Sequence, residues 1–93
     1  MSHRIDSIQR ESVGTTASQI AVDRRNFIIK NCSADATIYI KEYADDKKKA
    51  TSSNSFPINP GQTLEFVLNA KTLSVVASAA STSIAIMYIG ESY

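Results

Sequence analysis

The second half of the chain decides the fold, and it reads FPINPGQTLEFVLNAKTLSVVASAASTSIAIMYI over residues 56–89. In the runs 63–69, 72–78 and 82–89, large apolar side chains recur at every second position. A period of two is typical of half-buried strands. The short segment 56–58 contains a proline and is therefore an edge strand at best. The residues Asn59-Pro60-Gly61-Gln62 connect it to the run 63–69. This sequence predicts a tight turn, because proline presets the first corner and glycine accepts a positive φ at the second.

The first half of the chain continues the strand pattern. The runs 18–23, 27–30 and 36–41 show short strand-like alternation, and the last two flank a polar turn and indicate an antiparallel hairpin. We expect the polar residues 1–17 to form an extended N-terminal arm and residues 18–93 to form a β-sandwich domain. The sequence therefore predicts an all-β fold, a small antiparallel β-sandwich or barrel of about six to seven strands.

Composition narrows the classes of partner. The 93 residues suffice for one domain, and 10 basic against 9 acidic residues give a net charge of +1. This balance argues against a chain held on nucleic acid by counterion release. The longest apolar runs fall short of the roughly 20 residues that a membrane-spanning helix needs. We therefore expect neither nucleic acid nor a membrane among the partners.

The residues that carry chemistry are few and scattered. Cys32 and His3 are the single cysteine and histidine, and the histidine lies in the polar arm. Nucleophilic catalysis by the cysteine would need a basic partner close by. The acidic pair at 45–46 is followed directly by three lysines, which predicts a solvated charge cluster rather than a tuned acid–base pair. The sequence predicts no enzyme, no metal site and no cofactor.

The tyrosines keep one alternative open, because aromatic faces stack on sugar rings. A carbohydrate-binding module should display several exposed aromatic side chains on one face, whereas strand positions and strand ends explain most of these residues more simply. The four tyrosines are Tyr39, Tyr43, Tyr88 and Tyr93.

The run 82–89 is apolar on both faces. One interpretation is a central strand covered on both sides, and the other is a strand whose outer face meets a neighbouring subunit. We favour the subunit contact, because a domain this small has little material with which to cover a second face. The two faces consist of Ala85, Met87 and Ile89 against Ile84, Ile86 and Tyr88.

Four segments in a fixed order carry a resemblance to a known class. They are DRRNFIIKN (23–31), ATIYI (36–40), FPINPGQTLEF (56–66) and LSVVAS (73–78). This order resembles the small β-sandwich virion accessory proteins of tailed bacteriophages. In such modules an arginine, an apolar strand and an asparagine open a hairpin, and a proline–glycine turn leads into a later strand.

The resemblance implies a noncatalytic virion structural protein, assembled in the host cytoplasm. The favoured role is a capsid decoration or cement protein that stabilises the outer capsid. Expected partners are the major capsid protein or another virion protein, and copies of the chain itself, as a trimer. A neck or tail adaptor, a head-fibre protein and a carbohydrate-binding host-attachment module are the alternatives. The residues assigned to the interface are Ile5, Ile8, Val13, Arg24, Arg25, Met87 and Ile89.

Overall fold

The computed structural model describes residues 3–22, 26–43, 48–67 and 72–91, without the side chains of 3–7, 66–67 and 89–91. These residues form eight strands and no helix. The strands are β1 (His3–Val13), β2 (Ser18–Ala21), β3 (Asn26–Asn31), β4 (Ile38–Glu42), β5 (Phe56–Ile58), β6 (Thr63–Val67), β7 (Thr72–Ala77) and β8 (Thr82–Glu91). The predicted all-β class is confirmed.

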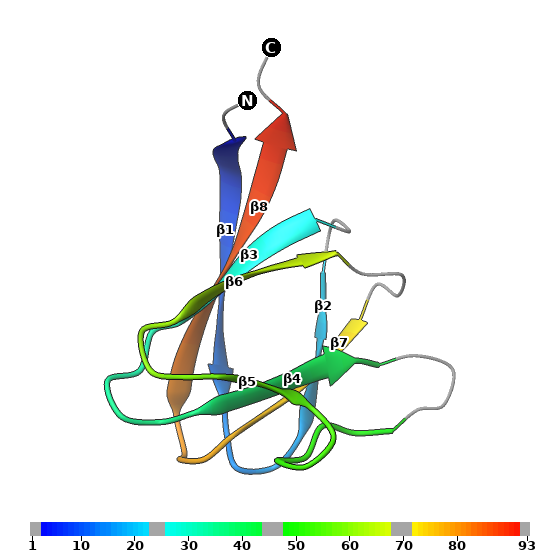
Figure 1. The fold of residues 1–93 in the computed structure, drawn as a ribbon, viewed down its shortest axis with the longest axis vertical. Helices are drawn as coiled ribbons and strands as arrows, with labels where there is room; N and C mark the ends of the chain where they lie inside the picture. Colours follow the sequence, from blue (N-terminus) through cyan, green and yellow to red (C-terminus); the bar gives the residue numbers. More distant parts are fainter. Residues whose placement is uncertain (1–2, 23–25, 44–47, 68–71, 92–93) are drawn as a thin grey trace.

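The strands form two four-stranded antiparallel sheets (Figure 1). Sheet A has the order β1-β8-β3-β6, and sheet B has the order β2-β7-β4-β5. The first half of the chain pairs with the second half in reverse: β1 with β8, β2 with β7, β3 with β6 and β4 with β5. The pairs β3–β8 and β4–β7 complete the sheets. This order is that of a jelly roll.

Residues 3–13, which the sequence predicts as an extended arm, form the extended edge strand β1 and raise the strand count from the expected six to seven to eight. The hydrophobic pattern did not reveal this strand, because Gln9 and Glu11 lie opposite the buried Ile86 and Ile84 of β8. Hydrogen bonds replace apolar packing there. The amide oxygen of Gln9 accepts from the Tyr88 hydroxyl, and its Nε2 donates to the carbonyl of Ala21 at 3.2 Å.

The predicted hairpin of residues 27–30 and 36–41 is wrong, because β3 lies in sheet A and β4 in sheet B. Both strands turn an apolar face to the same core, and alternation alone does not distinguish strands paired in one sheet from strands facing each other across two. The side chain of Asn31 stabilises the connection by which the chain passes from sheet A to sheet B. Its Nδ2 donates to the carbonyls of Ala36 at 2.7 Å and Ile58 at 2.9 Å, and its Oδ1 accepts from the amide of Ser33 at 2.9 Å.

The turn at Pro60-Gly61 is confirmed. Gly61 has φ +75°, and the amide of Gln62 donates to the carbonyl of Asn59 at 2.9 Å. The amide of Gly61 also donates to the carbonyl of Asn31 at 3.0 Å. The turn is thus hydrogen-bonded to the end of β3, next to the point where β6 joins sheet A.

The core fills the space between the two sheets. Phe27 and Tyr88 meet there edge to face, with ring centroids 6.4 Å apart. Burial of each large apolar side chain contributes about 1.5–3 kcal/mol. The cluster consists of Val13, Ile20, Val22, Phe27, Ile29, Ile38, Ile40, Ile58, Leu73, Val75, Ala77, Ile84, Ile86 and Tyr88.

Candidate functional site

An apolar row crosses the outer face of sheet A. Ile8 of β1 is the register partner of Met87 in β8, and Met87 is the register partner of Ile28 in β3. Ile84, Ile86 and Tyr88 are buried in the core, so alternation along β8 places Met87 on the opposite, outer face. We call Ile8, Met87 and Ile28 the sheet A row. Ile8 is 52% exposed, and the other two are half-buried.

Charged side chains border the sheet A row. Glu65 continues it onto β6, where it is the register partner of Ile28. In the neighbouring row, Arg10 and Lys30 flank Ala85, which is only 6% exposed although it lies on the outer face. Both are long basic side chains, a type whose aliphatic stem covers apolar surface while its charge stays in water. The face therefore combines an apolar centre with charges of both signs.

The structure separates the residues that the sequence assigned to an interface. Ile8 and Met87 lie side by side on the outer face of sheet A. Val13, by contrast, is fully buried in the core and cannot contact a partner. The backbones of Ile5 and Ile89 pair in register, while their side chains lie outside the description. Arg24 and Arg25 lie outside the described residues.

Strand β8 combines features of both interpretations of the run 82–89. It occupies a central position between β1 and β3, and its inner face is buried in the core. Its outer face carries Met87 in the sheet A row. Sequence reasoning missed Ile28 as a member of this row. Its place on the outer face follows from the alternation of Phe27 and Ile29, but its position beside Met87 depends on the pairing of β3 with β8.

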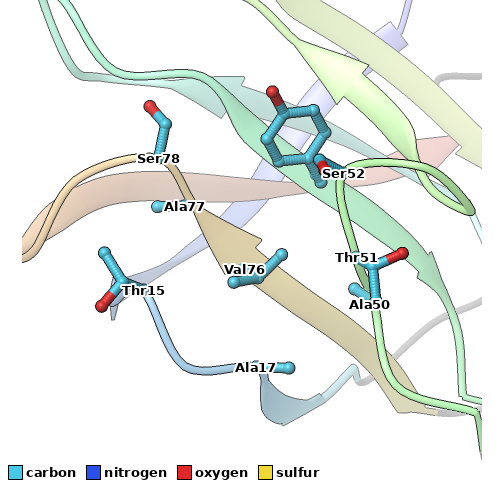
Figure 2. A pocket seen from close by; sticks show the side chains of 9 residues that line it. Thr15, Ala17, Ala50, Thr51, Ser52, Val76, Ala77 and Ser78 are labelled. Carbon is cyan, nitrogen blue, oxygen red and sulfur yellow. The ribbon is translucent and has the colours of Figure 1, made fainter.

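The outer face of sheet B holds a cavity of about 430 Å³. Tyr39 of β4 and Val76 of β7 are register partners at its base. Figure 2 shows Val76 between Thr15 and Ala17 on one side and Ala50 and Thr51 on the other. The remaining lining residues are Ser52, Ala77 and Ser78.

The segment 48–55 forms one wall of this cavity and is bonded to the sheet beneath it. The amide of Ala50 donates to the hydroxyl of Ser74 at 2.8 Å, and Ala50 is 3% exposed. The Lys41 ammonium donates to the carbonyl of Lys48 at 2.9 Å. Within the segment, the Asn54 side chain accepts from the amide of Thr51 at 2.8 Å. These bonds connect the wall to the sheet and brace it internally.

The tyrosines do not gather on one face in the part of the chain that the structure describes. Tyr88 is buried in the core on sheet A, whereas Tyr39 lines the cavity on sheet B. Tyr43 is half-buried after the end of β4 and is not among the residues that line the cavity. Tyr93 lies outside the described residues. The multi-aromatic face expected of a carbohydrate-binding module is therefore not formed by the described tyrosines.

The candidate chemical residues are also dispersed. Cys32 is exposed, and its amide donates to the carbonyl of Ser83 at 2.9 Å. The side chain of His3 and the acidic pair at 45–46 fall outside the description. Within the described ranges, no three histidine, cysteine, aspartate or glutamate side chains gather where a metal ion could bind. No helix suited to crossing a membrane occurs in those ranges either.

Comparison with known proteins adds no family to this picture. No protein-family model, no curated protein and no solved structure matches the chain. The resemblance to bacteriophage virion proteins stays a prediction.

Proposed function

We propose that this protein is a noncatalytic bacteriophage virion protein that decorates the outer capsid by binding other virion proteins. The observation that carries the proposal is the sheet A row, an apolar stripe across three adjacent strands of an outer sheet face. The sequence resemblance to bacteriophage virion accessory proteins is the reason for proposing a virion protein. The sheet A row is the surface through which it would bind another virion protein.

The chemistry of the sheet A row suits a protein partner. Apolar side chains that lie together on a surface mark interaction sites more often than apolar residues scattered singly do. Ile8 is 52% exposed at one end of the row, Glu65 lies at the other end, and Arg10 and Lys30 lie along one side. An apolar centre with a polar rim is the usual layout of a protein–protein interface. A partner would remove the apolar centre from water, and the rim would fix its orientation.

The jelly-roll fold is compatible with a capsid role, but it also occurs in proteins with other functions. Jelly rolls serve as viral capsid domains, and also as lectins and as cupin enzymes. Self-association is part of the proposal. In a three-fold ring, one surface of each copy meets a different surface of its neighbour.

Sedimentation tests the proposal directly. The wild-type chain is examined alone and with capsids, necks and tails of the virus that encodes it. We expect a trimer that co-sediments with capsids. Met87→Asp and Ile8→Asp should dissociate the trimer or release it from capsids, because each places a charge in the apolar row. Ser12→Asp is the control, since Ser12 is exposed on the same strand as Ile8 and lies outside the row.

The outcomes separate the alternatives. Thermal melts of all three variants by circular dichroism show whether each remains folded. A monomer that binds none of the virion parts would overturn the proposal. Binding to necks or tails in place of capsids would assign the protein to the adaptors.

A further inference from the structure

We infer that the cavity on the outer face of sheet B is a binding site for a neutral sugar ring. The site is separate from the sheet A row, because the two lie on opposite outer faces of the sandwich. Its volume of about 430 Å³ falls within the range of small-molecule sites, about 300–1,000 Å³. The inference does not depend on the proposed attachment to capsids.

Charge defines the class of ligand. All 9 residues that line the cavity have uncharged side chains. No charged side chain in the lining would pair with a phosphate, a carboxylate or an ammonium group. The ligand class is therefore neutral.

Free hydroxyl groups supply the polar contacts. In the described part of the chain, the hydroxyls of Thr15, Tyr39 and Ser52 have no hydrogen-bond partner. They come from the β1–β2 connection, strand β4 and the segment 48–55, so they approach the cavity from different sides. The hydroxyl of Ser78 is already engaged, because it accepts from the amide of Thr37 at 2.9 Å. A hydroxyl both donates and accepts, which matches the hydroxyl groups of a sugar.

Apolar groups supply the rest of the lining. The ring of Tyr39, the side chain of Val76 and the methyl groups of Ala17 and Ala50 border the same space. A pyranose ring has C–H groups on its faces and hydroxyls around its edge. An apolar base with hydroxyls at the sides is complementary to that shape, whereas a linear polyol offers no face to cover the base.

The cavity is formed before any ligand arrives. The wall formed by the segment 48–55 is held by the bond from the Ala50 amide to the Ser74 hydroxyl and by bonds within the segment. Preorganisation lowers the entropy lost on binding. A small ligand with few contacts still binds weakly, so we expect a dissociation constant on the order of 1–10 mM for a single hexose.

Nuclear magnetic resonance titration of the ¹⁵N-labelled chain tests the inference. The probes are glucose, galactose, mannose and N-acetylglucosamine, with glycerol and cyclohexanol as comparison compounds. At least one sugar should give saturable shifts confined to the amides of residues 15–17, 50–52 and 76–78. Glycerol should give none, because it lacks a ring. Cyclohexanol should bind more weakly than the best sugar, because a single hydroxyl satisfies fewer of the cavity's polar groups.

Two variants locate the site. Val76→Phe fills the base of the cavity with a residue that strands accept well, and it should lower the sugar affinity at least tenfold. Tyr39→Phe keeps the ring and removes one hydroxyl, so it should weaken binding severalfold. Tyr43→Phe is the matched control and should bind as the wild type does, because Tyr43 does not line the cavity. Unchanged spectra away from the cavity establish that each variant is folded.

The inference is overturned if no sugar gives saturable shifts at these amides, or if Val76→Phe binds sugar as well as the wild type. It is also overturned if cyclohexanol binds more tightly than every sugar, since the cavity would then recognise an apolar ring. Met87→Asp should bind sugar like the wild type. Failure of the sugar titration and failure of capsid binding are therefore distinguishable.

Discussion

A single buried asparagine joins the two sheets of this domain. Asn31 is fully buried and makes three side-chain hydrogen bonds, to Ser33, Ala36 and Ile58. We expect Asn31→Ala to lower the free energy of unfolding by about 3 kcal/mol, because two buried carbonyls lose their donor. Urea unfolding measures the change. Asn26→Ala, at an exposed position of the same strand, should stay within about 0.5 kcal/mol of the wild type, and equal losses in both variants would contradict this account.

The backbone of Gly61 carries the second residue-scale prediction. Its φ of +75° disfavours any residue with a Cβ, although no atom lies within 4 Å of the position that a Cβ would take. Gly61→Ala should therefore cost about 1–2 kcal/mol through backbone strain alone. Gly14 is equally open but has no positive φ, so Gly14→Ala should be neutral or stabilising by up to about 1 kcal/mol. Differential scanning calorimetry of the pair checks the contrast, and similar melting temperatures would refute it.

At the scale of the element, strand β1 is part of the fold. It pairs with β8 along most of its length and places Val13 in the core. Val13→Ala should lower the free energy of unfolding by about 2 kcal/mol, because it removes buried methyl groups and leaves a cavity. The exposed neighbour Ser12 provides the control, and Ser12→Ala should be silent in the same urea titration. If β1 were a dispensable arm, Val13→Ala would be silent too.

The individual strands were largely predictable, and their partners were not. Strand-like runs bounded by turn signals indicated seven of the strands, from Ser18–Ala21 to Thr82–Glu91, with the proline-containing segment 56–58 expected as an edge strand at best. The eighth, β1, has Gln9 and Glu11 at positions that face inward, so it shows no such pattern. The expected hairpin failed for a related reason. Periodicity reports which side of a strand is buried, and it does not report which strand lies beside it.

The candidate sites show the same division. Ile8 and Met87 were both assigned to the interface from the sequence, and the structure places them together. Ile28 joins them only through the pairing of β3 with β8. The cavity on sheet B was not predictable, because its lining combines the β1–β2 connection, strands β4 and β7 and the segment 48–55. None of these segments shows a binding motif on its own.

At the scale of the whole molecule, the jelly roll makes folding a non-local process. Strand β1 pairs with β8 at the other end of the chain, and β2 pairs with β7. Bringing distant strands together costs conformational entropy before their contacts form. We therefore expect refolding over about milliseconds to seconds. Stopped-flow tyrosine fluorescence follows it, since the chain has 4 tyrosines and no tryptophan. Refolding within microseconds would mean that local contacts dominate the transition state.

The sequence by itself determined the class of the fold and the turn at Pro60-Gly61. These properties depend on neighbours along the chain: a period of two, and a backbone angle that only glycine accepts freely. The tertiary structure alone decided the order of strands in the two sheets, the burial of Val13, and the assembly of the sheet A row and the cavity. Those properties depend on contacts between residues far apart in sequence, and the free energy of such contacts is realised only when the sheets close over one core.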